Sequence, residues 1–462
     1  MPLPGGDVTR GGPGGLDGGR AITAVDSGVT TPKDLHDDAI RRIDEWEPRL
    51  GAVVERIAFQ TPADGALRGM ILGIKNHADV AGYRNWTGLQ SRGMEAEPAV
   101  EDATVVHRLR AAGSTLVCTT SSPFLGGPGG VTPQTRNARV VDRVSGGSSG
   151  GSASAIAAGL VHAALGSDAG GSIRIPAACC GVVGLQTTRG VVPLTRAGGL
   201  TYSMGNVGPM AATVADARRV LDVISGFDPL DPYSVTVDRP DRWRGGPLRF
   251  GLPVELVDWN IDQEVADRFG EVVEMLSEAG HRIERVSLPM LRESMDLGPR
   301  TIGIVESGAI VADTMSDWLG DFPDLEETVR RAAAIPGSVA ARAYHRVALL
   351  RAKLRRLFTD YDLLLTPTLP CRVPDGSDPH HEAEIEVGGA VETRTSALTR
   401  LVNPWNLAAL PAGSLPVGRD SDGGPISLQL IGPQFADWKV LDVMEFVEEA
   451  AGGPWDTVPP PA

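Results

Sequence analysis

The stretch Ser145–Gly159 has the most distinctive chemistry in the sequence. It reads SGGSSGGSASAIAAG and places four glycines and three serines between Gly146 and Ser152, directly before an alanine-rich helical segment. Glycines permit positive φ angles and a close approach of the backbone to a ligand. The start of a helix offers free N–H groups to an anion or an oxyanion. We therefore expect a ligand to lie against this loop.

A second loop and a lysine add to this pattern. The loop Gly166–Pro176, GSDAGGSIRIP, has the same character, and a flexible linker rarely leads into a second loop of this kind. Lys75 ends the apolar run GMILGIK, which would carry its amine into the interior, although lysines are usually exposed. A serine hydroxyl needs an adjacent base to act as a nucleophile. A desolvated lysine, with a lowered pKa, can be that base.

Two other motifs compete for the first loop. It lacks the Gly-Lys-Ser/Thr ending of a P-loop, which disfavours nucleotide binding. Gly147–Gly151 satisfies G-x-S-x-G, the nucleophile elbow of α/β-hydrolases, with Ser149 as nucleophile. That alternative needs a later acid and a later histidine. The histidines that follow, none in a distinctive setting, are His281, His345, His380 and His381.

In order and spacing, these segments resemble the amidase signature family. The segments are GIKNHADVAG, GGSSGGS and GSDAGGSIRIPAACCGVVGLQ. Ser148 and Ser172 stand 24 residues apart, the family's separation between its bridging serine and its nucleophile. Weaker similarities extend the resemblance from about Thr31 to Ala450. They are TRN, VGPM, DLLLTPT, NPWNLAALPAGSLPVG and GPISLQLIGPQFAD.

The resemblance implies a Ser-cisSer-Lys catalytic triad. Ser172 would be the nucleophile and Lys75 the base. Ser148 would relay the proton between them from a cis peptide bond, with Gly147 as its partner in that bond. The same relay in reverse would protonate the leaving amine, and water would then hydrolyse the acyl-enzyme.

The loop before the nucleophile can turn successive backbone N–H groups toward one point and so form an oxyanion hole. The residues expected to supply these groups are Ala169, Gly170, Gly171 and Ser172. By the resemblance, Asp168 and Arg174 would pair to hold the loop.

Three positions depart from the family pattern. Asn76 and His77 stand where an acidic residue often follows the lysine, and Arg189 replaces an aromatic residue after the QTT stretch. All three lie on the expected substrate side. His77 is a candidate substrate contact, and a packed, partly buried histidine is the competing interpretation.

The elements that must position these residues alternate between helix and strand. Helices are predicted over Thr31–Ile57, with Thr31 as N-cap, over ATVVHRLRAAG and over Ala153–Leu165. Strands are predicted at GMILGIK, STLVCTT, GVVGLQ, PLRFGLP, YDLLLTPT and ISLQLIG, and a last helix near WKVLDVMEFVEEA. This alternation predicts an α/β fold whose sheet is covered on both faces. The resemblance implies a large mixed, mostly parallel sheet.

The chain is expected to form one catalytic domain. Residues 1–30 are expected to form a flexible, glycine-rich leader, and the folded structure is expected to begin near Thr31. Residues 31–462 are expected to form a single amidase domain, in which a mainly helical region at about 256–358 shapes the substrate pocket. The clearest amphipathic segments there are VADRFGEVVEMLSEAG and SVAARAYHRVALLRAKLRRLF.

The composition of the chain limits the kinds of partner and the cellular compartment that we expect for this protein. A net charge of -15 and a pI near 5.0, without a basic stripe, predict no nucleic-acid partner. The first residues lack the apolar core of a signal peptide, and Gly159 and His162 interrupt the Ala-rich run, so we expect no membrane association and a cytoplasmic protein. The four cysteines lack metal-ligand spacing, which predicts buried packing thiols, and we expect no metal and no cofactor.

The function expected is hydrolysis of a small-molecule carboxamide to an acid plus ammonia or an amine, through an acyl-enzyme on Ser172. A homodimer is one allowed assembly. The alternative is an ammonia-supplying glutaminase-type subunit of an amidotransferase complex. A binding protein without catalysis is disfavoured, because all three triad positions are intact. The sequence leaves the identity of the amide open.

Overall fold

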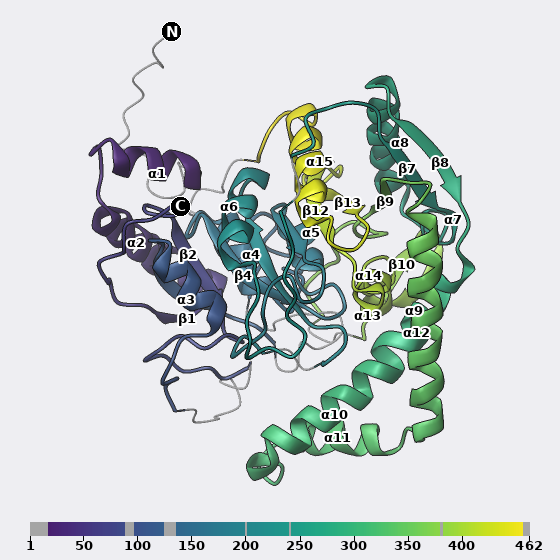
Figure 1. The fold of residues 1–462 in the computed structure, drawn as a ribbon, viewed down its shortest axis with the longest axis horizontal. Coiled ribbons are helices and arrows are strands. Elements are labelled where there is room, and N and C mark those ends of the chain that lie inside the picture. Colours follow the sequence, from purple (N-terminus) through teal and green to yellow (C-terminus); the bar gives the residue numbers. More distant parts are fainter. Residues whose placement is uncertain are drawn as a thin grey trace.

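The architecture rests on one sheet of eleven strands, seen in a computed structural model that describes residues 17–87, 97–123, 135–198, 201–239, 242–378 and 382–455 (Figure 1). In order across the sheet, the strands are β1 (Val53–Arg56), β3 (Thr115–Thr120), β2 (Ile71–Lys75), β4 (Ala163–Asp168), β6 (Asn206–Ala211), β5 (Val183–Gln186), β12 (Ala412–Arg419), β13 (Pro425–Ile431), β9 (Leu363–Pro367), β7 (Arg249–Pro253) and β8 (Arg282–Val286). A separate hairpin pairs β10 (Glu384–Val387) with β11 (Ala390–Thr393).

The sheet is mixed, as predicted. Parallel pairing is confined to two blocks, in which β2 lies between β3 and β4, and β7 lies between β8 and β9. The other six pairings are antiparallel, so parallel pairs are fewer than the sequence suggested. The reason lies in the connections: a tight turn at Asp420–Gly424 joins β12 to β13, and the described residues between β5 and β6 contain no helix.

Helices cover both faces of the sheet, which confirms the expected α/β class. One face packs against α3 (Thr104–Ala111), α6 (Val214–Ile224), α8 (Gln263–Glu278) and α15 (Asp437–Ala450). The other packs against α2 (Pro32–Leu50), α4 (Gly150–Ala157) and α5 (Arg174–Cys180). Side chains of β2 alternate between these layers, since Leu72 joins the first cluster and Ile71 the second.

Order begins earlier than the sequence suggested. Residues 1–16 of the predicted leader lie outside the described residues, but Gly18–Asp26 forms helix α1, so the expectation that order starts near Thr31 is wrong. Asp17 caps this helix by accepting from the Arg20 N–H, and Ala21 is fully buried. The Gly18 N–H donates to Asp216 of α6 at 2.8 Å. This distant contact has no signature in the local sequence.

Two predicted helices extend too far. The first begins as predicted, with Thr31 in a capping box, but α2 ends at Leu50 because Gly51 adopts a left-handed φ of 62°, and β1 follows. The helix predicted over Ala153–Leu165 stops at Ala157, and Ala163 already belongs to β4. The run AALG at Ala163–Gly166 is therefore the buried start of strand β4, and its apolar pattern is the same as that of a buried helix.

The region at 256–358 is mainly helical, with β8 as an exception at the edge of the sheet. Figure 1 shows α10 (Gly303–Thr314) and α11 (Pro323–Ala333) extending away from the sheet, and α12 (Gly337–Leu357) running back toward it. The remaining helices are α7 (Val254–Val257), α9 (Ser294–Leu297), α13 (Arg394–Thr399) and α14 (Asn403–Ala408).

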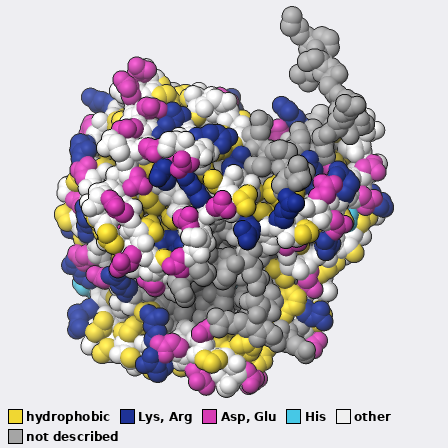
Figure 2. Space-filling view, turned by 180° about the vertical axis from the view of Figure 1, so that it is seen from behind, with side chains coloured by type: hydrophobic (Ala, Val, Ile, Leu, Met, Phe, Trp, Pro, Cys, Tyr) yellow, Lys and Arg dark blue, Asp and Glu magenta, His cyan; other side chains and the backbone are white. Residues whose placement is uncertain are grey.

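The surface carries charges of both signs. Figure 2 shows Lys and Arg side chains interspersed with Asp and Glu side chains over one face of the molecule. The described residues on this face thus form no continuous basic stripe of the kind that follows a phosphate backbone.

Candidate active site

Strand β2 carries Lys75 into the interior. All five residues of the strand are buried, and Lys75 is only 1% exposed. Its Nζ donates to Ser148 Oγ at 2.6 Å and to Ser167 Oγ at 2.8 Å. Burial lowers the pKa of Lys75 to about 7, against the opposing attraction of Asp168. Near neutral pH this amine therefore exists in both protonation states and can take up a proton.

Two loops bring the candidate serines together. Ser148 lies just before α4, and the peptide bond that joins it to Gly147 is cis. Ser172 lies just before α5 and is half-buried. The Ser149 N–H donates to the Ser172 carbonyl at 3.1 Å, which ties the two loops to each other. In the residues that the structure describes, no hydrogen bond joins the Ser148 and Ser172 hydroxyls.

Asp168 organises the second loop from inside. Its carboxylate accepts the Gly171 N–H at 2.7 Å and the Ile173 N–H at 3.1 Å. It also accepts from Arg174 Nε at 3.0 Å and Arg174 Nη2 at 3.1 Å, and both side chains are fully buried. Burial alone would raise the pKa of Asp168, but the Arg174 charge and these hydrogen bonds hold it below its ordinary value. Asp168 thus remains an anion.

Arg174 extends this network to the C-terminal part of the chain. Its Nη1 donates to the Val402 carbonyl and to Gln429 Oε1, both at 2.7 Å. Its Nη2 donates to Asn406 Oδ1 at 2.7 Å, and Asn406 Nδ2 donates to Asp168 Oδ1 at 2.8 Å. The loop before α5 is therefore fixed to α14 and β13.

One of the four expected oxyanion donors, the Gly171 N–H, is already engaged. Gly171 has a φ of 116°, and a β-carbon there would lie 2.3 Å from Val402 Cγ2, so only glycine fits. Its N–H is already donated to Asp168, however, and is not free for an oxyanion. The N–H groups of Ala169, Gly170 and Ser172 have no acceptor among the described residues.

The residues after Lys75 make local contacts. Asn76 Nδ2 donates to the Arg84 carbonyl at 2.8 Å, and Asn76 Oδ1 accepts the Trp86 N–H at 2.9 Å. His77 is buried, with Nε2 at 2.9 Å from Ser122 Oγ. Burial, followed by the charge of Lys75, holds the pKa of His77 well below its ordinary value. His77 is therefore a neutral imidazole at pH 7.

Arg189 is bound by the segment that precedes β6. Its guanidinium donates to the Gly205 carbonyl at 2.6 Å and to the Tyr202 carbonyl, and it stacks 4.1 Å from the ring centre of Tyr233. Arg189, which stands where the family pattern often has an aromatic residue, therefore has the aromatic ring of Tyr233 as a neighbour.

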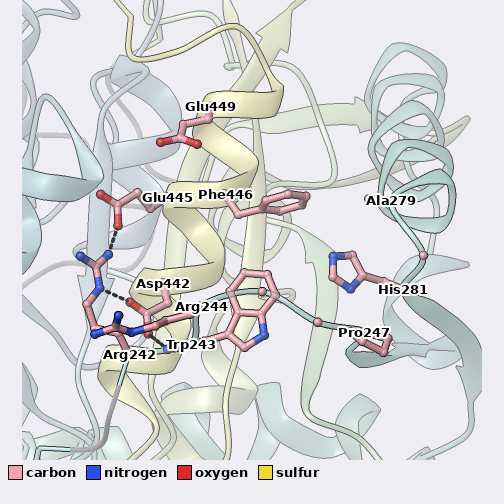
Figure 3. Close-up of a pocket in the computed structure, with 13 residues that line it drawn as sticks. Arg242, Trp243, Arg244, Pro247, Ala279, His281, Asp442, Glu445, Phe446 and Glu449 are labelled. Carbon is pink, nitrogen blue, oxygen red and sulfur yellow. Dashed lines mark hydrogen bonds and ion pairs between the residues drawn. The ribbon is translucent and has the colours of Figure 1, made fainter.

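The described residues give no support to the nucleophile-elbow alternative. Ser149 is fully buried, and its Oγ donates to the Ser167 carbonyl at 3.3 Å. His281 lies elsewhere, against Trp243 and Phe446 in a cavity of about 660 Å³ (Figure 3). His281 Nδ1 accepts the Leu248 N–H at 3.1 Å. His345 is exposed on α12, and His380 and His381 lie outside the described residues.

Sequence reasoning missed several members of this network. Ser167, the second hydroxyl at the Lys75 amine, stands inside the loop motif GSDAGGS and could have been found there. Asn406 and Gln429 lie more than 230 residues beyond Arg174. Their segments resembled the family, but the sequence did not indicate that these two amides bind the buried guanidinium.

Two further features are absent from the described residues. No helix there is long and apolar enough to cross a membrane, and no group of three or more His, Cys, Asp or Glu side chains could hold a metal ion. The cysteines are buried and unpaired, as expected, and burial raises the pKa of the Cys118 and Cys180 thiols to about 12.

Known proteins are similar to this chain in both sequence and fold. The Amidase family model matches residues 49–441. A glutamyl-tRNA(Gln) amidotransferase subunit of Halothermothrix orenii is 32% identical over 91% of this chain and 94% of its own length. The protein of the same name from Natronomonas pharaonis is 34% identical over 84% of this chain and 96% of its own.

Solved structures agree with these relatives. The glutamyl-tRNA(Gln) amidotransferase subunit of the same name from Thermotoga maritima superposes with a TM-score of 0.80 at 29% identity, covering 93% of this chain and 95% of that one. A bacterial aryl acylamidase of the amidase signature family superposes with a TM-score of 0.82 at 26% identity, covering 95% and 96%. With its sheet, its two glycine-rich loops and these matches, the chain belongs to the amidase family, the amidase signature enzymes that hydrolyse amide carbon–nitrogen bonds.

Proposed function

We propose that this protein is an amidase that hydrolyses a carboxamide to a carboxylic acid plus ammonia or an amine, through an acyl-enzyme on Ser172. The observation that carries the proposal is the hydrogen bond of 2.6 Å from the buried Lys75 amine to Ser148 Oγ. A lysine with a pKa of about 7 can be the base that an amidase needs.

The reaction starts with Ser172 Oγ attacking the amide carbonyl carbon. As the C–O bond forms, the Ser172 proton passes to Ser148 Oγ, and the Ser148 proton passes to the neutral Lys75 amine. The tetrahedral intermediate collapses when Lys75 returns a proton through Ser148 to the leaving nitrogen, which departs as ammonia or an amine. Water repeats the same sequence on the acyl-enzyme, releases the acid and restores Ser172.

The negative charge on the carbonyl oxygen is stabilised by backbone donors. The N–H groups of Ala169, Gly170 and Ser172 are those without an acceptor in the described structure. Donors held in place before the reaction lower the barrier without reorganisation, typically by about 3 kcal/mol for each donor. Asp168 and Arg174 act by holding this loop in place.

A second candidate function is supply of ammonia to a partner protein. The relatives named as glutamyl-tRNA(Gln) amidotransferase subunits, which match most of this chain, favour it. In that case glutamine would be the amide, and the protein would act as one member of a complex. Both candidates place the chemistry on Ser172, and we propose a cytoplasmic location for either.

Replacing the nucleophile separates chemistry from folding. In Ser172→Ala, amide turnover should fall to background because no acyl-enzyme can form, while the circular dichroism spectrum and Tm stay those of the wild type. A fluorophosphonate should label Ser172 in the wild type, as located by peptide mass mapping. Turnover near the wild-type rate in Ser172→Ala, or labelling at Ser149, would contradict the assignment.

The pH profile tests the base. Because Lys75 must be neutral to accept the proton, kcat/KM should rise about tenfold per pH unit below pH 7 and level off above it, with an apparent pKa of about 7. Lys75→Met should lose most of the activity together with this ionisation. His77→Ala should keep the rise in kcat/KM. A profile that disappears in His77→Ala and survives in Lys75→Met would make histidine the base.

Arg174 tests how the loop is held. Arg174→Met leaves the Asp168 carboxylate buried without its partner, so the free energy of unfolding in urea should fall by about 3–5 kcal/mol. Fluorophosphonate labelling of Ser172 should also slow per folded molecule. The matched control is Arg300→Met, which removes the exposed pair with Asp296 and should cost no more than about 1 kcal/mol. Equal losses in the two variants would refute a buried organising pair.

The two candidate functions differ in their dependence on a partner. The protein expressed alone is passed over a size-exclusion column, and ammonia release is measured in its monomer or homodimer fractions with a panel of amides. An amidase should release ammonia from at least one simple amide. If activity appears only with glutamine and an added amidotransferase partner, the second candidate replaces the first.

A further inference from the structure

A pocket of about 190 Å³ opens beside helix α12. Five of its lining residues come from this helix, namely Tyr344, Val347, Ala348, Arg351 and Arg355. Their spacing places them on one face of the helix. Tyr344 and Arg355 are exposed and Val347 is buried, so the pocket leads from the surface to an apolar floor.

Two residues that line this pocket are sequence neighbours of residues in the Asp168 network. Leu407 and Ser203 line it, and each directly follows or precedes a residue of the Asp168 network. Asn406 Nδ2 donates to Asp168 Oδ1 at 2.8 Å and lies 3.4 Å from the Met204 carbonyl oxygen. Two lining residues are therefore joined through the backbone to residues whose contacts hold the nucleophile loop.

Helix α14 gives a second link to the nucleophile loop. Asn403 lies one turn before Leu407, and its Oδ1 is 3.7 Å from the position that a β-carbon would take at Gly170. One helical turn spans about 5.4 Å. The nucleophile loop and the pocket therefore both lie against the same short helix, about one turn apart along it.

The pocket carries an excess of positive charge. Arg351 and Arg355 line it, and Arg189 is near enough that burial, then Arg189, then Arg355 lower the pKa of Arg351. None of the three guanidinium groups forms an ion pair within the part of the chain that the structure describes. Arginine stays protonated even when buried. The attraction of Glu306 acts on Arg351 and Arg189, and that of Asp231 on Arg189, so these two arginines are only partly balanced.

The nearest carboxylate is already engaged. Glu306 is buried and accepts from the Tyr344 hydroxyl at 2.7 Å and from the Ser203 N–H at 3.0 Å. Arg351 Nε donates to the Leu407 carbonyl at 2.8 Å, and its two Nη groups remain available. A guanidinium with free donors binds a carboxylate through paired, charge-assisted hydrogen bonds.

We propose that this pocket is the substrate subsite for an anionic group, and that the protein acts on short aliphatic amides that also carry a carboxylate. This inference rests on the proposed amidase function. The apolar residues Val347 and Leu407 accommodate the aliphatic chain, and Arg351 and Arg355 bind the carboxylate. The carboxylate can belong to the acyl side of the amide or to its amine side.

The test compares amides that differ only in charge. Binding to Ser172→Ala protein is measured by calorimetry for glutaramate against valeramide, and for N-acetyl-β-alanine against N-propylacetamide. The anionic member of at least one pair should bind about tenfold more tightly or better, because only its carboxylate can accept charge-assisted hydrogen bonds from the arginines. The pair that shows the difference identifies the side that carries the carboxylate.

Variants then assign the preference to the pocket. In Arg355→Gln, whose side chain is exposed, and in Arg351→Gln, the ratio of anionic to neutral affinity should fall about tenfold. Arg356→Gln, exposed on the same helix but outside the pocket, should keep the wild-type ratio. Equal affinities within both pairs, or a ratio unchanged in both pocket variants, would overturn the subsite.

Because calorimetry on Ser172→Ala needs no turnover, it separates the two proposals. Charge-dependent binding without hydrolysis by the wild type would keep the subsite and reject the amidase function. Hydrolysis of both members of each pair, without a charge preference in binding, would keep the amidase function and reject the subsite.

Discussion

The structure depends on the amine of Lys75, which is buried where water cannot solvate it. A buried ammonium is costly, so Lys75 is stable there only because it can lose its proton and because two hydroxyls receive its hydrogen bonds. This constraint explains the wholly buried strand β2, which leaves the side chain no route to solvent. It also explains the neutral His77 beside it, since a second cation in that layer would add repulsion to the cost of burial.

The buried pair of Asp168 and Arg174, unlike Lys75, keeps its charges. Asp168 and Arg174 stay ionised because every donor around them is matched, first within the loop and then by Asn406 and Gln429. The same carboxylate holds Gly171 and Ile173, so the backbone at the candidate nucleophile is fixed by electrostatics rather than by packing alone. The ionic network joins the loop after β4 to β13, which lies on the far side of β6, β5 and β12 in the sheet order.

Local chemistry was easier to predict from the sequence than spatial neighbours. The two glycine-rich loops, the strand that carries Lys75 and the capping box at Thr31 all follow from residue types at short spacing. The end of α2 was missed because an apolar pattern does not show that Gly51 adopts a left-handed conformation. The early end of α4 was missed because the buried start of β4, AALG, has the same apolar pattern as a buried helix. Helix α1, the engaged Gly171 N–H and the Arg174 partners depend on contacts between distant segments, which no local window contains.

The distribution of these residues along the chain has an evolutionary consequence. Lys75, the two loops and Arg174 all fall between residues 75 and 176, whereas the pocket face of α12 lies far downstream on a helix that is largely exposed. Substitutions on that face change the lining of the pocket without disturbing the buried amine or the ion pair. Evolution can therefore change the lining of this pocket through substitutions on one helix, in a part of the sequence separate from the reaction centre.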